Sequence, residues 1–347
     1  MTLTCRLLAP AEEPAWDAFV EAHPDGTFFH RAGWRRVVAR SFGHATYYLL
    51  TERAGAITGV LPLGRIKTAL FGDMLVSAPF CVYGGPLATD AESLAALLAE
   101  AQAIQTRLGT PVMEFRTRTP PPDEALQGWV KRDDLYVTFR KPITASDDAN
   151  LKAIPRKQRA MVRKGISNGL ISVVEDDAHL LYPIYAESVR NLGTPVFARH
   201  YFDVMLEEFA GSIDIVTIID GPHAIASVMN FYFRDEVIPY YGGGTRAARD
   251  RAANDFMYWE VMRRGAARGC RIFDFGRSKH GTGALSFKKN WGFTPEPLQY
   301  RYRLAPGAEL PNLNPLNPKF RLFIAAWKRL PLPIAGILGP PIVRGLG

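Results

Sequence analysis

The sequence has only three cysteines, Cys5, Cys81 and Cys270, and no two of them lie close together. Zinc and redox sites need closely spaced pairs, so the sequence predicts no metal site and three reduced, buried thiols. No cationic segment followed by an apolar run opens the chain, which argues against a cleaved signal. No stretch approaches the roughly 20 apolar residues that span a bilayer, and we therefore expect a cytoplasmic protein.

Several catalytic motifs are also missing. The sequence contains no H-E-x-x-H pair, and the stretch GTGALSFKK lacks the spacing of a P-loop. The seven histidines are dispersed, and only His280 lies within a dense group of charged residues, where a lone histidine is more often a surface residue than a base. These absences exclude the zinc peptidases and P-loop NTPases that depend on such motifs.

The chain has 347 residues, 47% of them hydrophobic and 22% charged, which is the composition of a globular protein with about two domains. Its formal net charge is +8 and its pI is about 9.4. This excess favours an anionic partner, such as a phosphate-bearing substrate, RNA or an acidic lipid, although excess charge more often lies on solvated faces. We expect no DNA partner and no cofactor.

The two halves of the chain repeat one plan. In each half a strand hairpin is followed by a strand that ends in glycines, a helix that stops at glycine and a short strand. The landmarks Tyr83-Gly84-Gly85 and Phe115 recur about 160 residues later as Tyr241-Gly242-Gly243 and Phe275. The sequence therefore predicts an α/β protein with two tandem domains, 1–145 and 150–305, a polar linker over 141–152 and a Pro-rich amphipathic tail over 306–347.

The densest group of charged residues follows the last predicted strand. Asp274, Arg277 and Lys279 lie at and just past the end of that strand, and Lys288 and Lys289 come a few residues later. Loops at strand ends can bring charged groups together on a ligand, and a lysine there can hold a phosphate or a developing oxyanion. The alternative is a solvated basic loop with one structural aspartate, and spacing alone does not separate the two.

A second basic segment is predicted to be helical from about residue 153 to 169. Arg156, Arg159 and Arg163 then share one face, because residues spaced i, i+3 and i+7 do so in a helix. Guanidinium groups in such a row can hold a diphosphate or RNA phosphates, and we favour that role over a merely solvated face.

Three polar or aromatic residues lie on the two strands before the last helix of the repeat. Tyr240 and Tyr241 precede the glycines, and alternation would point one side chain inward and the other outward. A phenol there could relay a proton or orient an amine, whereas core packing is the commoner fate. Asn230 stands in apolar sequence, where it is either a satisfied buried amide or a substrate contact.

These segments resemble a known family. The run DFGRSKHGTGALSFKKNWGF is similar to the C-terminal signature of FemAB-like proteins, and IPRKQRAMVRKGISNGL resembles their Arg-rich helix. The combination with NLGTPVFARHYFDVMLEEF and with the tail looks like FemAB-related proteins of PEP-CTERM/exosortase and exopolysaccharide systems. The resemblance covers residue 150 onward, and the element order of each half is like that of a GNAT acyltransferase domain.

The resemblance implies two tandem GNAT-like domains, each with a mixed, mostly antiparallel sheet flanked by helices. It implies amide formation, in which an acyl or aminoacyl group passes from an activated carrier, an acyl-CoA or aminoacyl-tRNA, to a small-molecule or nucleotide-linked amine. The donor would lie where two strands splay apart. The family lysine maps to Lys288 or Lys289 as oxyanion stabiliser, with Asp274 and Tyr241 orienting the amine. Substrate contacts would come from Arg156, Arg159, Arg163, Arg277, Lys279, Asn230 and Tyr240.

Other functions stay open. One is an acyl-CoA-dependent GNAT enzyme, another a noncatalytic binding protein of a surface-polysaccharide system, and a third an RNA-binding role through the arginine helix. In the tail, Phe320, Phe323, Ile324 and Trp327 mark one face of a short helix, and prolines at 331, 333, 340 and 341 are expected to break the chain beyond that helix into irregular structure. This tail is either a strap packed over the domains, which we favour, or a peripheral membrane contact.

Overall fold

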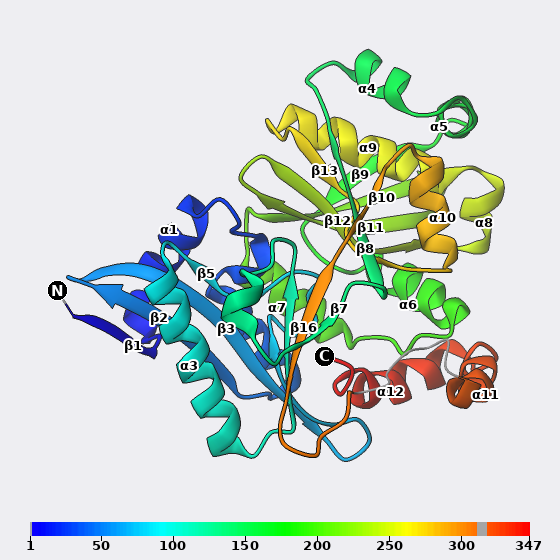
Figure 1. Cartoon of the computed structure of the whole chain (residues 1–347). Coiled ribbons are helices and arrows are strands. Elements are labelled where there is room, and N and C mark those ends of the chain that lie inside the picture. The colour runs from blue at the N-terminus through cyan, green and yellow to red at the C-terminus, as the bar shows by residue number, and fades with distance from the viewer. Residues whose placement is uncertain (1, 311–317) are drawn as a thin grey trace. The chain divides into compact units, whose positions relative to one another are not determined.

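The computed structural model describes residues 2–310 and 318–347. It contains two compact units, and each has its own sheet (Figure 1). The first unit comprises Met1–Asp134, Leu298–Asn314 and Val343–Gly347, and the second comprises Leu135–Pro297 and Pro315–Ile342. These boundaries differ from the expected ones at 145, 150 and 305 for two reasons. A strand at Gln299–Leu304 pairs in the first sheet, and residues 136–142, which were expected to belong to the first domain, form a strand of the second sheet.

The first unit is built on an eight-stranded sheet with the order β1-β2-β3-β4-β6-β16-β7, to which β5 is added beside β3. The pairing of β4 with β6 is parallel and the other pairings are antiparallel. Its elements are β1 (Leu3–Leu7), α1 (Glu13–Ala22), α2 (Gly33–Phe42), β2 (Thr46–Arg53), β3 (Ala56–Thr68), β4 (Gly72–Ser77), β5 (Leu87–Ala88), α3 (Ala91–Leu108), β6 (Val112–Thr117), β7 (Val130–Arg132) and β16 (Gln299–Leu304).

The second unit has a sheet with the order β14-β8-β13-β12-β11-β10-β9, to which β15 is added beside β8. Only β12 and β13 pair in parallel. Its elements are β8 (Tyr136–Pro142), α4 (Asp147–Ala153), α5 (Arg156–Ser167), β9 (Ile171–Glu175), α6 (Leu181–Leu192), α7 (Arg199–Glu208), β10 (Ile213–Asp220), β11 (His223–Phe233), β12 (Glu236–Gly244), α8 (Arg246–Asp250), α9 (Ala253–Ala267), β13 (Ile272–Asp274), β14 (Ser278–Lys279), α10 (Gly283–Asn290), β15 (Pro295–Pro297), α11 (Pro318–Trp327) and α12 (Leu332–Val343).

Local sequence signals account for the ends of several helices. The side chain of Asp90 accepts a hydrogen bond from the backbone N–H of Ser93 and so caps the start of α3. Gly109, with φ of 63°, ends the same helix in the left-handed region, where glycine has no steric penalty. The prediction that a helix of the first half stops at a glycine is therefore confirmed. The two sheets and their helices confirm the fold class of mixed, mostly antiparallel sheets flanked by helices.

In the second unit the sheet is covered on both faces. Val228 and Val237 face α9, where they belong to one buried cluster with Met257 and Trp259. A Cβ on Gly265 of α9 would come within 2.6 Å of Val237 Cγ1, so this glycine allows the helix to lie close to β12. On the opposite face, Tyr241 of β12 packs against Tyr185 of α6. The result is a helix–sheet–helix arrangement in which β12 is buried on both sides.

Two expectations about connecting segments were wrong. The predicted polar linker over 141–152 instead contains the end of β8 and nearly all of α4, which Ser146 caps through a hydrogen bond from Ala149 N. The prolines at 340 and 341 do not break the tail, because they lie inside α12, which continues to Val343. Pro333 lies in the first turn of that helix, where its missing N–H has no intrahelical partner to lose. Phe320 falls among residues whose side chains lie outside the described part of the chain.

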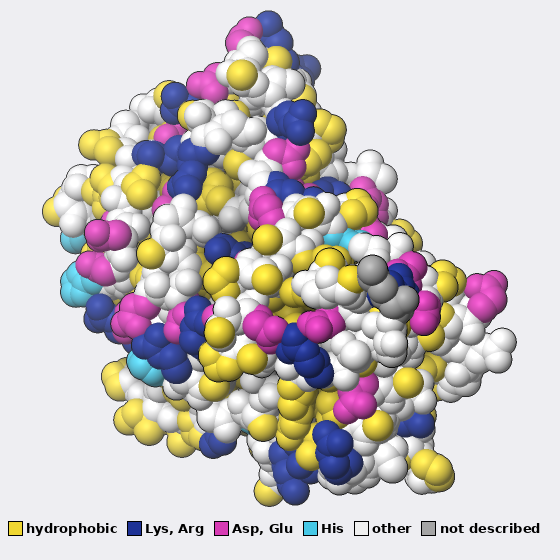
Figure 2. Space-filling view, turned by 90° about the vertical axis from the view of Figure 1, so that its left-hand side faces the viewer, with side chains coloured by type: hydrophobic (Ala, Val, Ile, Leu, Met, Phe, Trp, Pro, Cys, Tyr) yellow, Lys and Arg dark blue, Asp and Glu magenta, His cyan; other side chains and the backbone are white. Residues whose placement is uncertain are grey.

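One face of the molecule carries charged side chains of both signs. On the face that Figure 2 presents, Lys and Arg alternate with Asp and Glu, and hydrophobic side chains lie between them. In the described part of the chain, no helix is long and apolar enough to cross a membrane.

Candidate functional site

The main feature of the second unit is a point at which two neighbouring strands separate. β12 and β13 are paired only at Glu236↔Ile272 and Val237↔Phe273. From there β12 continues to Gly244, whereas β13 ends at Asp274 and pairs on its other side with β8. The sheet therefore opens after two paired positions, at the strands for which the sequence predicted a splay.

A β-bulge lies on β12 next to this opening. Met229 pairs with Tyr241 and Asn230 pairs with Pro239, so Tyr240 is the extra residue. In a bulge two successive residues oppose one residue of the partner strand, which breaks the usual alternation. The rings of Tyr240 and Tyr241 accordingly contact each other edge to face, with centroids 4.7 Å apart. The expectation that one tyrosine points inward and the other outward was wrong for this reason.

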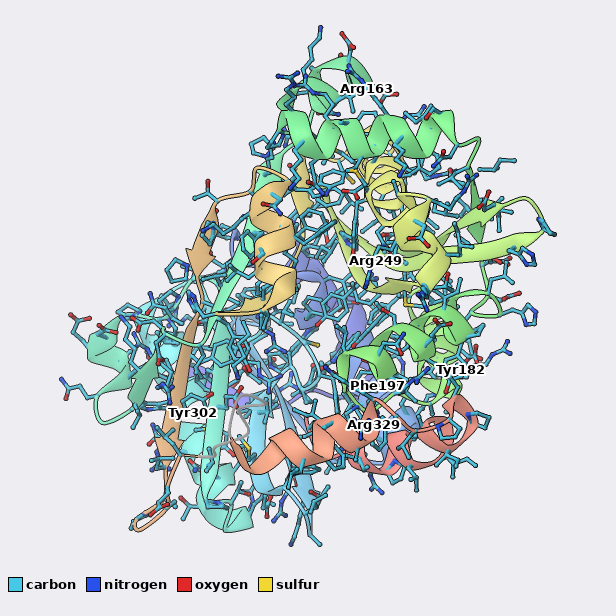
Figure 3. All side chains as sticks on the ribbon, turned by 90° about the vertical axis from the view of Figure 1, so that its right-hand side faces the viewer. Arg163, Tyr182, Phe197, Arg249, Tyr302 and Arg329 are labelled. Carbon is cyan, nitrogen blue, oxygen red and sulfur yellow. The ribbon has the colours of Figure 1, made fainter. Side chains whose placement is uncertain are left out.

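Aromatic side chains from three elements surround these tyrosines. The hydroxyl groups of Tyr241 and Tyr201 are 2.8 Å apart, and Phe197 packs against both rings. Burial raises the pKa of Tyr241 well above its ordinary value, so its phenol stays protonated at neutral pH. Tyr182, on α6, and Phe197 are only partly buried, and both are labelled in Figure 3. We call this group, made by Tyr182, Tyr185, Phe197, Tyr201, Phe202, Tyr240 and Tyr241, the aromatic cluster.

The glycines that end β12 bring two helices close to the strand. A Cβ on Gly243 would come within 2.3 Å of Ser188 Cβ on α6, and a Cβ on Gly244 would come within 2.4 Å of Asn254 Oδ1 on α9. Any side chain there would push the helices away. The N-terminus of α9 is thereby held beside the end of β12. No side chain caps this terminus, and Ala252 before it has a left-handed φ of 58°.

Asp274 is the last residue of β13 and is fully buried. Its Oδ1 accepts a hydrogen bond of 2.6 Å from the backbone N–H of Gly276, and its Oδ2 lies 3.5 Å from Nε of Arg140 on β8. Arg140 also forms an ion pair with Glu236, the first residue of β12. The three charges thus join the strands at the level where they are still paired. These contacts show that Asp274 supports the loop, and its expected role of orienting an amine stays a prediction.

Lys288 lies in the last turn of α10, and its ammonium group is turned back toward the Asp-Phe-Gly loop. Nζ donates hydrogen bonds to the carbonyl oxygens of Phe275, Gly276 and Arg277 at 2.6, 3.1 and 3.0 Å. A lysine has three donors, so these carbonyls occupy all of them. Burial lowers the pKa of Lys288 to about 7, while the nearby Asp274 opposes this effect. This geometry makes Lys288 a positioning residue of the loop.

The remaining charged residues of this segment reach the surface. Arg277 and Lys279 both lie over the ring of Tyr136, at 4.6 and 5.5 Å from its centroid, and both are partly exposed. Lys289 and His280 are exposed. Lys289 is therefore accessible to a ligand, unlike its neighbour Lys288, whose ammonium group faces the protein.

The arginine helix forms as predicted, over Arg156–Ser167. Arg156 and Arg163 are exposed and Arg159 is partly exposed, so the three share an accessible face. In Figure 3 Arg163 lies on the outer side of α5, away from Phe197 and Tyr182. The Arg163 end of the arginine helix therefore lies away from the aromatic cluster.

The N-terminal end of the arginine helix is nevertheless tied to α10. A Cβ on Gly292 would come within 2.9 Å of Pro155 Cδ, and Trp291 and Gln158 both donate to Asp255. The arginine row is thus anchored beside the segment that carries Lys288 and Lys289.

Asn230 is fully buried on β11, on the face opposite the aromatic cluster. Its amide nitrogen donates to Asp214 Oδ1 at 3.0 Å and to Val228 O at 3.3 Å. Its Oδ1 has no hydrogen-bond partner within the described residues. Asn230 is therefore a partly satisfied core amide.

Several residues of this region were not singled out from the sequence. Arg140 and Glu236 are residues of a type usually found at the surface, and the pairing of β8 with β13 brings Arg140 to Asp274. The aromatic cluster left a signal, because five aromatic residues lie between Tyr182 and Phe202. Within residues 2–310 and 318–347, no group of three His, Cys, Asp or Glu residues has the geometry of a metal site.

Comparisons with known proteins agree with this architecture. Residues 150–289 match the acetyltransferase (GNAT) domain family. No curated protein matches the sequence. The structure is similar to FemX, with 17% identity, 87% of this chain and 97% of that chain covered, and a TM-score of 0.68.

Two further solved structures share the fold. A tandem GNAT protein from the clavulanic acid biosynthesis pathway has 12% identity, covers 89% of this chain and 100% of its own, and gives a TM-score of 0.58. L-PGS from Bacillus licheniformis has 13% identity, covers 99% and 98%, and gives a TM-score of 0.55. The chain as a whole therefore has the fold of tandem GNAT proteins, and its residues 150–289 match the acetyltransferase (GNAT) domain family.

Proposed function

We propose that this protein is an N-acyltransferase that moves an acyl or aminoacyl group from an activated carrier to an amine. The observation that carries the proposal is the separation of β12 from β13 after two paired positions, with the bulge at Tyr240 beside it. A strand that leaves its neighbour in mid-sheet exposes backbone groups to which an extended donor arm can hydrogen-bond. The match of residues 150–289 to the GNAT domain family supports this assignment.

The donor in this proposal lies along β12 with its phosphates at the start of α9. A helix N-terminus carries partial positive charge and unsatisfied N–H groups, which favour phosphate. Arg246 and Arg249 of α8 are exposed immediately before this terminus and supply positive charge. A Cβ on Gly244 would come within 2.4 Å of Asn254 Oδ1, so the strand end and this terminus lie close enough for one donor to contact both.

The acceptor amine approaches from the side of the aromatic cluster. Its nitrogen attacks the carbonyl carbon of the donor, the C–S or C–O bond to the carrier breaks, and the proton of the amine passes to solvent. Such a transfer depends on positioning and needs no covalent intermediate with the protein. Tyr241 stays protonated because of its burial, so it can donate a hydrogen bond but cannot act as a base at neutral pH.

The charged loop after β13 is assigned to substrate binding. Arg277, Lys279 and Lys289 reach the surface, and with Arg156, Arg159 and Arg163 they offer cationic contacts for a phosphate-bearing acceptor or for a tRNA carrier. Lys288 and Asp274 fix the loop that leads to Arg277 and Lys279. The resemblance in sequence favours an acceptor from cell-envelope or exopolysaccharide metabolism, and the link to PEP-CTERM systems stays a prediction.

A binding and transfer assay tests this function. We expect acyl-CoAs, aminoacyl-tRNA or UDP-sugars to raise the melting temperature of the protein, because a ligand that binds only the folded state stabilises it. The double substitution Arg246→Ala and Arg249→Ala should lower the affinity for the donor that stabilises the protein by at least about tenfold, since two charge-assisted contacts are lost. Arg271→Ala is the matched control, because that side chain is 79% exposed and forms its ion pair with Asp235, away from the start of α9.

Two results would count against the proposal. If the donor binds the Arg246/Arg249 variant as tightly as the wild type, its phosphates do not lie at the start of α9. Binding without any transfer of label to an amine would favour a noncatalytic binding protein with the same fold.

A further inference from the structure

The outer face of α12 consists entirely of apolar residues. Ala335, Gly339 and Val343 form its buried side, and a Cβ on Gly339 would come within 2.7 Å of the backbone of Val196. The opposite side presents Ile334, Ile337 and Leu338, and Ile337 is 74% exposed. A helix on the surface of a soluble protein normally turns charged or polar residues outward. Here the segment from Leu330 to Val343 contains no polar side chain at all.

The neighbouring helix α11 also exposes apolar residues. Trp327 anchors it to the second unit, because its Nε1 donates to the carbonyl oxygen of Thr194 at 3.0 Å. Leu322 and Phe323 point outward instead, and Leu322 is 84% exposed. Leu192, at the end of α6, is 69% exposed. It precedes Gly193, which lies against Ile324 of α11, so it lies next to the same helix. We call this set, Leu192, Leu322, Phe323, Ile334, Ile337 and Leu338, the tail patch.

The charge of this region has one sign only. From Leu310 to the last residue the sequence contains no Asp or Glu and five basic residues, Lys319, Arg321, Lys328, Arg329 and Arg344. Lys328 and Arg329 are exposed in the short connection between α11 and α12, and Figure 3 shows Arg329 at this junction. Arg344 is exposed just after α12. Cations therefore lie at both ends of the apolar face.

We propose that the tail patch binds the surface of an anionic lipid bilayer. Apolar side chains that enter the boundary between headgroups and acyl chains are stabilised by leaving water, and flanking lysines and arginines pair with lipid phosphates. The long stems of these cations lie along the apolar surface while their charges reach the headgroups. The two helices lie on the membrane rather than across it, since neither is long enough to span the hydrocarbon core.

The charge pattern argues against a second copy of this chain as the occupant. A symmetric dimer places the same patch of each subunit against the other. Two tail patches would then bring Lys328, Arg329 and Arg344 of both copies together without an acidic residue from either tail. An anionic membrane supplies the opposite charge. Lipid binding by the tail patch does not depend on the proposed acyl transfer.

Co-sedimentation of the full chain with vesicles tests the proposal. We expect the protein to pellet with vesicles of phosphatidylcholine and phosphatidylglycerol at low salt, and to bind pure phosphatidylcholine vesicles at least about tenfold more weakly. Ile337→Asp with Leu338→Asp should lower the vesicle affinity by about tenfold or more, because both side chains leave the apolar phase. Lys328→Gln with Arg329→Gln should reduce affinity for the anionic vesicles only.

The control variant is Leu70→Asp, because Leu70 is 72% exposed on the first unit and lies outside the tail patch. Its vesicle affinity should equal that of the wild type, and thermal unfolding should show that all variants are folded. Equal binding of the Ile337/Leu338 variant and the wild type would overturn the proposal. So would a dimer in solution that the same two substitutions convert to a monomer while vesicle binding is absent.

Discussion

The indole N–H of Trp291 donates a hydrogen bond of 2.9 Å to Oδ1 of Asp255. The same oxygen accepts a hydrogen bond of 2.8 Å from Nε2 of Gln158. One carboxylate of α9 therefore joins α5 to the residue that follows α10. Because Asp255 is buried, these two donors determine how closely the arginine helix and the lysine-bearing helix approach each other.

This relationship predicts a pH dependence of stability. Burial raises the pKa of Asp255 above its unfolded value of about 3.8, so the folded state binds this proton more tightly than the unfolded state. The contribution is complete below that pH and is lost as the pH rises through the folded pKa. Asp255→Asn has no such loss. We therefore expect urea unfolding to show the variant gaining stability relative to the wild type as the pH rises above 3.8 and through the raised pKa of the folded state.

A second variant separates charge from hydrogen bonding. Asp255→Leu removes the acceptor and leaves the N–H groups of Trp291 and Gln158 buried without their partner. We expect its free energy of unfolding to be about 2–4 kcal/mol lower than that of Asp255→Asn at every pH, because neither variant titrates at this position. If Asp255→Leu is as stable as Asp255→Asn, the hydrogen bonds do not hold the helices together.

The two adjacent lysines should differ in their effect on stability. Lys288→Met keeps the aliphatic stem but removes the ammonium group that binds three carbonyl oxygens, and we expect a loss of about 1–3 kcal/mol. Lys289→Met should change stability by less than about 0.5 kcal/mol, because Lys289 is exposed. Urea unfolding of both variants provides the measurement. Equal losses would show that the loop does not depend on Lys288.

The close contacts of the glycines of β12 predict that an added side chain lowers the stability of the protein. Gly243→Ala places a Cβ within 2.3 Å of Ser188 Cβ, so we expect a loss of about 2 kcal/mol or more and a weaker transfer activity. Ser188→Gly in the same chain should restore part of the stability, because it removes the opposing atoms. Gly283→Ala is the control, since a Cβ there meets nothing within 4 Å. A failure of Ser188→Gly to rescue would place the strain elsewhere.

The hydroxyl pair of the aromatic cluster can be tested by a double-mutant cycle. Tyr201→Phe and Tyr241→Phe each remove one partner of the 2.8 Å contact. We expect a coupling energy of about 1 kcal/mol in the free energy of unfolding, the usual value for a neutral hydrogen bond. Tyr241→Phe should leave the shape of the pH–rate profile of transfer unchanged, because the buried phenol does not titrate near neutral pH. If Tyr241→Phe removes an ionisation step from the profile, the phenol of Tyr241 does titrate during transfer.

Much of the fold follows from local patterns. The cap at Asp90 and the glycine at 109 define α3, and the helix of arginines lies within the predicted range. The opening between β12 and β13 was expected from the order of elements, and the structure confirms it. The bulge at Tyr240 was not predicted, because it depends on how β11 and β12 pair and leaves no mark on residue types.

The sequence by itself determined where the helices and strands lie, because hydrophobic period, capping residues and glycine ends act over a few neighbouring residues. Only the tertiary structure decided what the charged residues do. Lys288 and Lys289 are chemically identical neighbours, yet the packing of α10 on the Asp-Phe-Gly loop turns one inward and leaves the other in solvent. Asp274 meets Arg140 through strand pairing across more than a hundred residues of chain, and no local pattern encodes that contact.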